Sequence, residues 1–344
     1  MKIARFCASC LTLILTAVFF CWLLPGQTAS ANGDQTHPRD SGVLSPADEA
    51  EIAEILRLKT ELGDQVWPGL SRLDVPIILF NERFEFLVGE ANPASAWEAV
   101  RTDNFLGRTY FRRPAENPQA FAVAVGTRWA GSIGTLELMN NQIPFQLSRE
   151  FHVVLALHEV FHAFQATLAP QRFARAMGVY KSGEKYPYKD SQFSTAWNSE
   201  GEALADALIT TEEATVSGLV RKFLHIREAR RRQTALDPEL ISYERELEWL
   251  EGLAKYAEVQ FYKLAASRAS EAAYANYRSG HPFWPADLAR LRRNLGGQEG
   301  DLRFYLSGVA QAILLDRLSP GWKAKALEEK ANLDDRLQAA IIPD

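Results

Sequence analysis

A long apolar segment, residues 149–169, constrains the fold of this chain more than any other feature. It contains no proline or glycine, and Ser148 before it is a suitable N-cap, so we expect an α-helix. Apolar residues occupy nearly every side of that helix, which predicts that it is buried. Its central stretch LALHEVFHAFQ nevertheless carries His158, Glu159 and His162. Three such polar groups on a buried helix need hydrogen-bonding or charged partners, or a metal ion, to offset the cost of their burial.

His158, Glu159 and His162 form the pattern H-E-x-x-H. Positions i and i+4 lie one turn apart on one face of a helix, so both imidazoles can bind one Zn²⁺ at about 2.0–2.1 Å. Glu159 lies beside them, where it can accept a proton from a metal-bound water instead of binding the metal. A charged group in an apolar interior is costly unless it is paired or bound to a metal. The pattern therefore predicts a zinc site, and the alternative is two core histidines hydrogen-bonded to nearby carboxylates. His152, further upstream, is interpreted as a packing or surface residue.

A catalytic zinc site has three protein ligands and one position open to water. The three cysteines all lie within the first 21 residues, and the remaining histidines stand in no recognisable ligand pattern. A carboxylate is therefore the expected third ligand. Three glutamates compete for this place, namely Glu200, Glu202 and Glu251.

The surroundings of the three glutamates differ. Glu200 shares a helical face with the apolar residues of WNSEGEALADAL, so we expect it to be buried. Gly201 beside it would let a neighbouring helix or the metal approach closely. Glu251 also borders apolar residues, but the argument for burial is weaker there than for Glu200. Glu202 lies on a more polar side of its helix. We therefore favour Glu200 as the third ligand, with Glu251 as the alternative.

HEVFH followed by W-x-x-E-G-x-A resembles the gluzincin branch of the zinc metallopeptidases, in which the glutamate before the glycine is the third ligand. The residues that match are Trp197, Glu200, Gly201 and Ala203. The stretch EGLAKY, which begins at Glu251, resembles another form of this pattern. Glu202 with Asp206 resembles a third form, in which the aspartate supports a ligand histidine. The resemblance covers residues 148–256 and implies a zincin-like fold and a zinc-dependent peptidase of unassigned subfamily.

The expected reaction is hydrolysis of a peptide bond. Zinc would polarise the carbonyl and lower the pKa of its water, and Glu159 would act as general base and pass the proton to the leaving amine. Tyr305 is the candidate oxyanion donor, with Tyr256 and His281 as rivals. The alternatives are a zinc hydrolase acting on a non-peptide amide or ester, and a non-catalytic zincin-fold binding protein. The intact Glu159 argues against the last, because a non-catalytic site needs no base there.

The order of the patterns predicts an α+β fold. Short β-rich runs at 75–80, 84–89 and within 120–138 precede the apolar helix. Helical patterns follow it to the C-terminus, at 193–213, 215–233, 237–268 and 301–318. We expect an N-terminal mixed β-sheet layer, then the active-site helix, then a mainly helical C-terminal lobe. A single metallopeptidase-like domain is expected over 46–344, with the sheet and active-site helix in 46–168 and the helical lobe in 169–344. The basic run 221–232 is interpreted as the solvated face of a helix.

The N-terminus has the pattern of a secretory signal peptide over residues 1–31. Lys2 and Arg5 precede an apolar run that is shorter than the roughly 20 residues that span a bilayer, and A-S-A follows. We expect cleavage, with an uncleaved anchor as the alternative, and export to the periplasm or the extracellular space. Polar residues 32–45 predict a flexible spacer.

The charge of the exported part limits its partners. Without Lys2 and Arg5, 36 of the 38 basic residues remain against 43 acidic residues, a formal charge of −7. This argues against nucleic acid and against stable membrane association after signal cleavage. A peptide or protein substrate is the expected partner, and the sequence does not indicate an oligomeric state.

Overall fold

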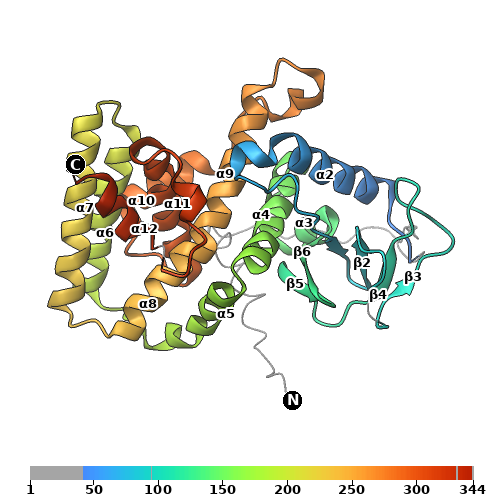
Figure 1. Ribbon diagram of the computed structural model, residues 1–344, viewed down its shortest axis with the longest axis horizontal. Coiled ribbons are helices and arrows are strands. Elements are labelled where there is room, and N and C mark those ends of the chain that lie inside the picture. Colours follow the sequence, from blue (N-terminus) through green and yellow to red (C-terminus); the bar gives the residue numbers. More distant parts are fainter. Residues whose placement is uncertain (1–41, 94, 331, 343–344) are drawn as a thin grey trace. The chain divides into compact units, whose positions relative to one another are not determined.

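The computed structural model describes residues 42–93, 95–330 and 332–342 (Figure 1). The expected signal peptide, with all three cysteines, lies outside these residues, as does most of the expected spacer.

Two compact units make up the described chain. The first contains residues 42–56 and 74–160, and the second contains residues 57–73 and 161–342. The boundary crosses two continuous helices, α2 (Pro46–Val66) and α4 (Arg149–Leu168), rather than a linker.

The first unit contains a six-stranded mixed sheet with the strand order β3-β4-β2-β1-β6-β5. Strands β1 and β6 are parallel, and the other neighbouring strands pair antiparallel. One sheet combined with many helices confirms the α+β class. Four of the strands were expected from the β-rich runs, whereas β3 and β4 had no clear pattern. The strands are β1 (Ile77–Phe80), β2 (Phe84–Val88), β3 (Glu98–Ala99), β4 (Phe111–Pro114), β5 (Phe121–Val125) and β6 (Arg128–Gly134).

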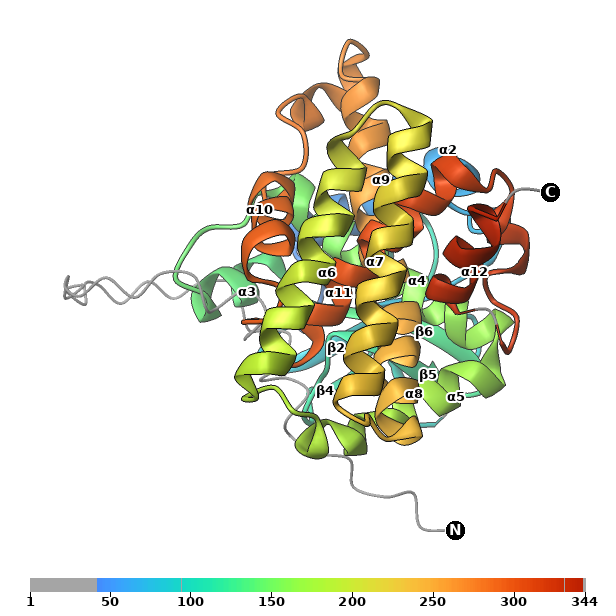
Figure 2. The same ribbon diagram turned by 90° about the vertical axis from the view of Figure 1, so that its left-hand side faces the viewer.

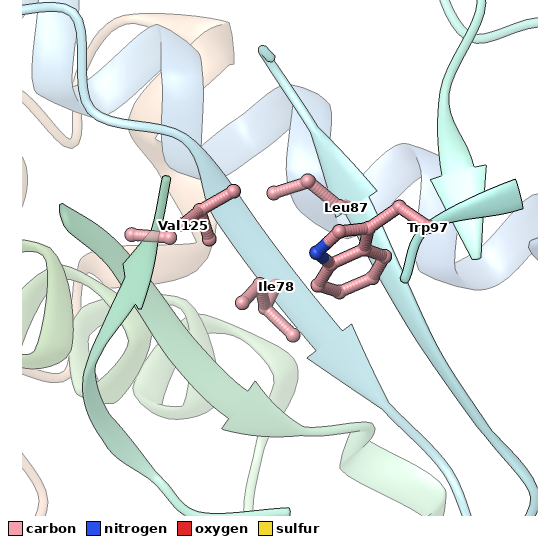
Figure 3. Packing of buried hydrophobic residues seen from close by; sticks show 5 residues of the cluster. Ile78, Leu87, Trp97 and Val125 are labelled. Carbon is pink, nitrogen blue, oxygen red and sulfur yellow. The ribbon is translucent and has the colours of Figure 1, made fainter. Parts of the chain in front are cut away.

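The two faces of this sheet have different roles. Ile78, Leu87, Trp97 and Val125 form an apolar cluster on one face (Figure 3). On the opposite face, Gly131 of β6 lies against α4, where a Cβ on it would be only 2.7 Å from the backbone nitrogen of Val160. Only glycine permits so close an approach. The sheet therefore supports α4 directly beneath the HEVFH segment. Helix α3 (Leu136–Gln142) joins β6 to the loop before α4.

The last residues of the expected spacer are ordered against the first unit, which corrects part of that prediction. Leu44 is buried, and its backbone N–H donates a hydrogen bond to the Tyr110 hydroxyl at 3.1 Å. Arg112 donates a hydrogen bond to the carbonyl of Gly42 at 2.7 Å. Ser45 caps α2, accepting a hydrogen bond from the backbone N–H of Asp48 at 3.1 Å.

The second unit is helical. Helices α6 and α7 lie side by side in it with α11 behind them (Figure 2). Helices α8 and α9 follow each other directly, joined by a π-helical turn, Glu248–Gly252. The helical segments expected from the sequence are confirmed, while α5, α10 and α12 were not anticipated. The bounds are α5 (Pro170–Val179), α6 (Ser191–Ile209), α7 (Glu213–Gln233), α8 (Pro238–Leu247), α9 (Leu253–Ser267), α10 (Trp284–Asn294), α11 (Asp301–Leu318) and α12 (Leu333–Ala340).

The basic run 221–232 is not simply a solvated helix face, contrary to expectation. Arg227 and Arg230 of α7 are each only 1% exposed. Arg227 binds Glu248 through two hydrogen bonds of 2.6 and 2.9 Å, and Arg230 binds Glu244 at 2.6 Å. Buried charges require such partners, so this face of α7 is a polar core of the second unit.

Among the described residues, no helix combines the length and the hydropathy needed to cross a lipid bilayer.

Candidate metal centre

Helix α4 carries the H-E-x-x-H residues, as the sequence predicts. It runs without interruption from Arg149 to Leu168. His158 is 5% exposed and His162 is fully buried. The boundary between the two units falls between these histidines, but both stand on the same continuous helix, one turn apart.

Glu251 is the carboxylate that the structure brings to the histidines. Its Oε2 lies 3.3 Å from Nε2 of His162. Ligand atoms of His158, His162 and Glu251 all lie within 4.8 Å of one another, and all three side chains are buried. Among the described residues, this is the one cluster of at least three such side chains with the spacing of a metal site.

The π turn Glu248–Gly252 places Glu251 on the helical rod formed by α8 and α9. π-Helical turns are rare and occur frequently at functional sites. Glu248, at the start of this turn, is held by Arg227 and also accepts a hydrogen bond from Ser307 of α11 at 2.6 Å. The polar core of the second unit thus anchors the turn that carries the third candidate ligand.

A hydrogen bond from His162 defines which of its nitrogens faces Glu251. The side-chain amide of Gln165 donates to the carbonyls of Trp249 at 2.9 Å and Leu250 at 3.3 Å, so its oxygen faces Nδ1 of His162 at 3.0 Å. Nδ1 must therefore carry the proton and donate it to Gln165. The other ring nitrogen, Nε2, then faces Oε2 of Glu251 at 3.3 Å.

Tyr180 contacts the opposite side of the Glu251 carboxylate. It follows α5 directly, and its hydroxyl donates a hydrogen bond to Oε1 of Glu251 at 2.6 Å. Burial, followed by the negative charges of Asp301 and Glu251, raises the pKa of Tyr180 well above its ordinary value of 10.0. Tyr180 therefore stays protonated and acts as a donor. Burial, and then the charge of Glu251, also raises the pKa of Asp301.

Glu200, which the sequence favoured as third ligand, lies elsewhere. It is fully buried, as expected, but its two carboxylate oxygens accept hydrogen bonds from Arg227 at 2.8 Å and Arg230 at 2.6 Å. The structure does not bring it together with the histidines. Two arginines, rather than a metal, compensate its burial, so Glu251 replaces Glu200 as the candidate ligand. Glu202 is exposed.

The remaining candidates occupy varied positions. Glu159 is buried beside His158 on α4. Tyr305 is half-buried on α11 and is close enough to Tyr180 to contribute to the raised pKa of that residue. The rivals of Tyr305 as oxyanion donor have other partners. Tyr256 donates to Asp316 at 2.6 Å, and His281 lies 2.8 Å from Glu258.

His152 is a packing residue, one of the two roles expected for it. It is fully buried, its Nδ1 pairs with Glu51, and its Nε2 lies 2.9 Å from the carbonyl oxygen of Gly134.

Sequence reasoning missed two residues of this centre, Gln165 and Tyr180. Gln165 could have been found, because it follows His162 by three positions and so lies on the same side of the helix. Tyr180 stands in a polar and aromatic loop whose sequence gives no indication of where it folds.

Comparison with protein-family models, with curated proteins and with solved structures finds no match for this chain.

Proposed function

We propose that this chain is a zinc-dependent metallopeptidase in which His158, His162 and Glu251 hold the metal and Glu159 is the general base. The observation that carries the proposal is the buried cluster of two histidines and one glutamate. Two histidines and a carboxylate are the protein ligands of one common class of catalytic zinc site.

The atoms that face one another in this cluster fit a cation. Nε2 of His162 faces the Glu251 carboxylate at 3.3 Å, and in the neutral imidazole with its proton on Nδ1 it presents a lone pair to that carboxylate. A lone pair and an ionised carboxylate oxygen repel each other unless a cation or a proton lies between them. Zinc suits a site of imidazole nitrogen and carboxylate oxygen, and ligand histidines generally donate their second N–H to a nearby acceptor, as His162 does.

A bound zinc ion would polarise the scissile carbonyl and lower the pKa of the attacking water. Glu159 would accept a proton from that water and deliver it to the leaving amine. Its position next to His158 on α4 fits this role, and its burial keeps the carboxylate away from bulk solvent. Tyr305 remains our candidate for the donor to the developing oxyanion.

The resemblance to the gluzincins supports the same conclusion, and with it a zincin-like fold. HEVFH stands on a helix that lies against the sheet, and EGLAKY begins at Glu251, the carboxylate near the histidines. On the pattern of the N-terminal sequence, we place the activity outside the cytoplasm. Hydrolysis of a non-peptide amide or ester would use the same residues and is the alternative.

Comparing wild type with Glu159→Gln tests this function. Both proteins are loaded with zinc and incubated with a broad peptide mixture, and the products are identified by mass spectrometry. We expect the variant to keep its zinc and to lose about 10²- to 10⁴-fold in turnover, the usual contribution of a general base. Glu150→Gln, in the first turn of the same helix, is the matched control and should cleave like wild type.

Two results would contradict the proposal. One is a zinc-loaded wild type that cleaves no peptide in the mixture, and the other is a Glu159→Gln variant with wild-type turnover. In the first case, cleavage of amide or ester substrates outside the peptides would support the alternative hydrolase.

A further inference from the structure

The side chain of Gln165 connects the two elements that carry the candidate ligands. It is fully buried on α4, one turn after His162. Its oxygen accepts the Nδ1 proton of His162, and its NH₂ group donates to the carbonyls of Trp249 and Leu250. Those two carbonyls belong to the π turn whose fourth residue is Glu251. One amide group therefore contacts both His162 and the backbone beside Glu251.

Only an amide can make this set of bonds at this place. The imidazole needs an acceptor, and the two carbonyls need donors. A carboxylate of the same length supplies the acceptor but no donor, and an apolar side chain supplies neither. Both carbonyls belong to the π turn, so the donors of Gln165 also stabilise this unusual turn.

We propose that Gln165 is a positioning residue that sets the tautomer of His162 and fixes the π turn, so that His162 Nε2 and Glu251 Oε2 face a single zinc ion. This inference rests on the proposed zinc site. It adds to the proposed site a residue that acts through His162 and the π turn and does not bind the metal itself. Hydrogen-bond partners of ligands typically contribute 10- to 100-fold in metal affinity.

A pair of isosteric variants measures this contribution. Gln165→Met keeps the length of the side chain and removes all three hydrogen bonds. Gln311→Met is the matched control, because Gln311 is also fully buried in the second unit but donates only to the carbonyl of Ser307 in its own helix. Both full-length variants and wild type are stripped of metal, and their zinc affinities are measured by competition with a chromophoric chelator.

We expect Gln165→Met to bind zinc about 10- to 100-fold more weakly than wild type, and Gln311→Met to bind it with wild-type affinity. Urea unfolding of the metal-free proteins shows whether both variants fold. Equal zinc affinities for wild type and Gln165→Met would overturn the inference, as would an equal loss in the two variants. A wild type that binds no zinc would instead refute the proposed function.

A measurement on zinc-loaded wild type keeps the inference testable even if Gln165→Met does not fold. Long-range ¹H–¹⁵N spectra distinguish histidine rings protonated at Nδ1 from those protonated at Nε2, and loss of a signal in His162→Gln assigns the ring. We expect His162 to carry a slowly exchanging proton on Nδ1. A proton on Nε2 would overturn the inference while leaving zinc binding intact.

Discussion

Gly252 and Gly308 bring the π turn and α11 into direct backbone contact. A Cβ on Gly252 would lie 2.5 Å from the Cα of Gly308, and a Cβ on Gly308 would lie 2.6 Å from the carbonyl oxygen of Glu248. Real Cβ atoms do not approach backbone so closely, so both positions need glycine. Because Glu251 directly precedes Gly252, the position of this carboxylate depends on the contact between the two helices.

Gly308→Ala should therefore disturb both stability and zinc binding. The added methyl group has to push the π turn away from α11, and overpacking of this kind costs about 1–3 kcal/mol. Urea unfolding measures the free energy, and chelator competition measures the zinc affinity, which we expect to fall. Gly218→Ala on α7 is the control, because a Cβ there meets no atom within 4 Å. An unchanged or raised stability of Gly308→Ala would show that the helices can separate without cost.

Glu251→Gln and Glu200→Gln should impair different properties of the protein. The Glu251 variant removes a charged ligand, so we expect a large loss of zinc affinity. The Glu200 variant leaves Arg227 and Arg230 buried without its charge. Breaking a buried ion pair by removing one partner costs about 3–5 kcal/mol, so we expect a large loss of stability. Chelator competition and urea unfolding on both proteins separate the two roles. Loss of zinc from the Glu200 variant alone would restore Glu200 as the ligand.

Glu200 illustrates which features of the site the sequence could and could not predict. Helical periodicity correctly predicted that this glutamate is buried. The absence of proline and glycine from residues 149–169 correctly predicted the helix that carries the H-E-x-x-H residues. The partner of Glu200 was not predictable, because Arg227 and Arg230 lie 27 and 30 positions further along the chain. A basic run looks the same in sequence whether it faces water or buried carboxylates. Pairing over such distances depends on tertiary packing.

The place of Glu251 in the site was hard to predict because of the local geometry of its helix. A helical wheel assumes 100° per residue, but the chain passes through a π turn at Glu248–Gly252. One extra residue in that turn changes the direction of the side chains on either side of it. The local sequence consists of helix-forming residues and contains no signal for the π turn. The close approach of Gly252 and Gly308 depends on tertiary packing, so the sequence does not show it either.

Tyr180→Phe should weaken zinc binding without removing it. The hydroxyl of Tyr180 holds Oε1 of Glu251 and leaves Oε2 directed toward His162. Without this bond the carboxylate can rotate, and we expect about 10- to 100-fold lower zinc affinity. Tyr188→Phe is the control from the same loop, since the Tyr188 hydroxyl contacts Tyr243 instead. An unchanged zinc affinity combined with a large loss of turnover would indicate that Tyr180 acts on the substrate rather than on Glu251.

Acid should destabilise the second unit through Glu244. Burial alone would raise the pKa of Glu244, but the charges of Arg230 and Arg231 outweigh it and lower that pKa well below its ordinary value of 4.5. The folded state therefore holds the ionised form, and the stabilisation is fully present above the unfolded pKa. It is lost as the pH falls below about 4.5 toward the folded pKa, because the unfolded chain then binds the proton more tightly.

Urea unfolding between pH 7 and pH 3 measures this dependence. We expect the unfolding free energy of wild type to decrease on acidification, and that of Glu244→Gln to be lower at pH 7 and to decrease less. Glu299→Gln is the control, because Glu299 is an exposed glutamate of the second unit. Parallel curves for wild type and Glu244→Gln would exclude Glu244 as a source of the acid sensitivity.

Metal analysis of the purified full-length protein tests the central claim most directly. Wild type and Glu251→Ala are incubated with zinc and freed of unbound metal, and their zinc content is measured by inductively coupled plasma mass spectrometry. We expect one zinc ion per wild-type chain and a clear loss of zinc in the variant. Absence of stoichiometric zinc from folded wild type, or equal zinc contents in the two proteins, would contradict a metal centre formed by His158, His162 and Glu251.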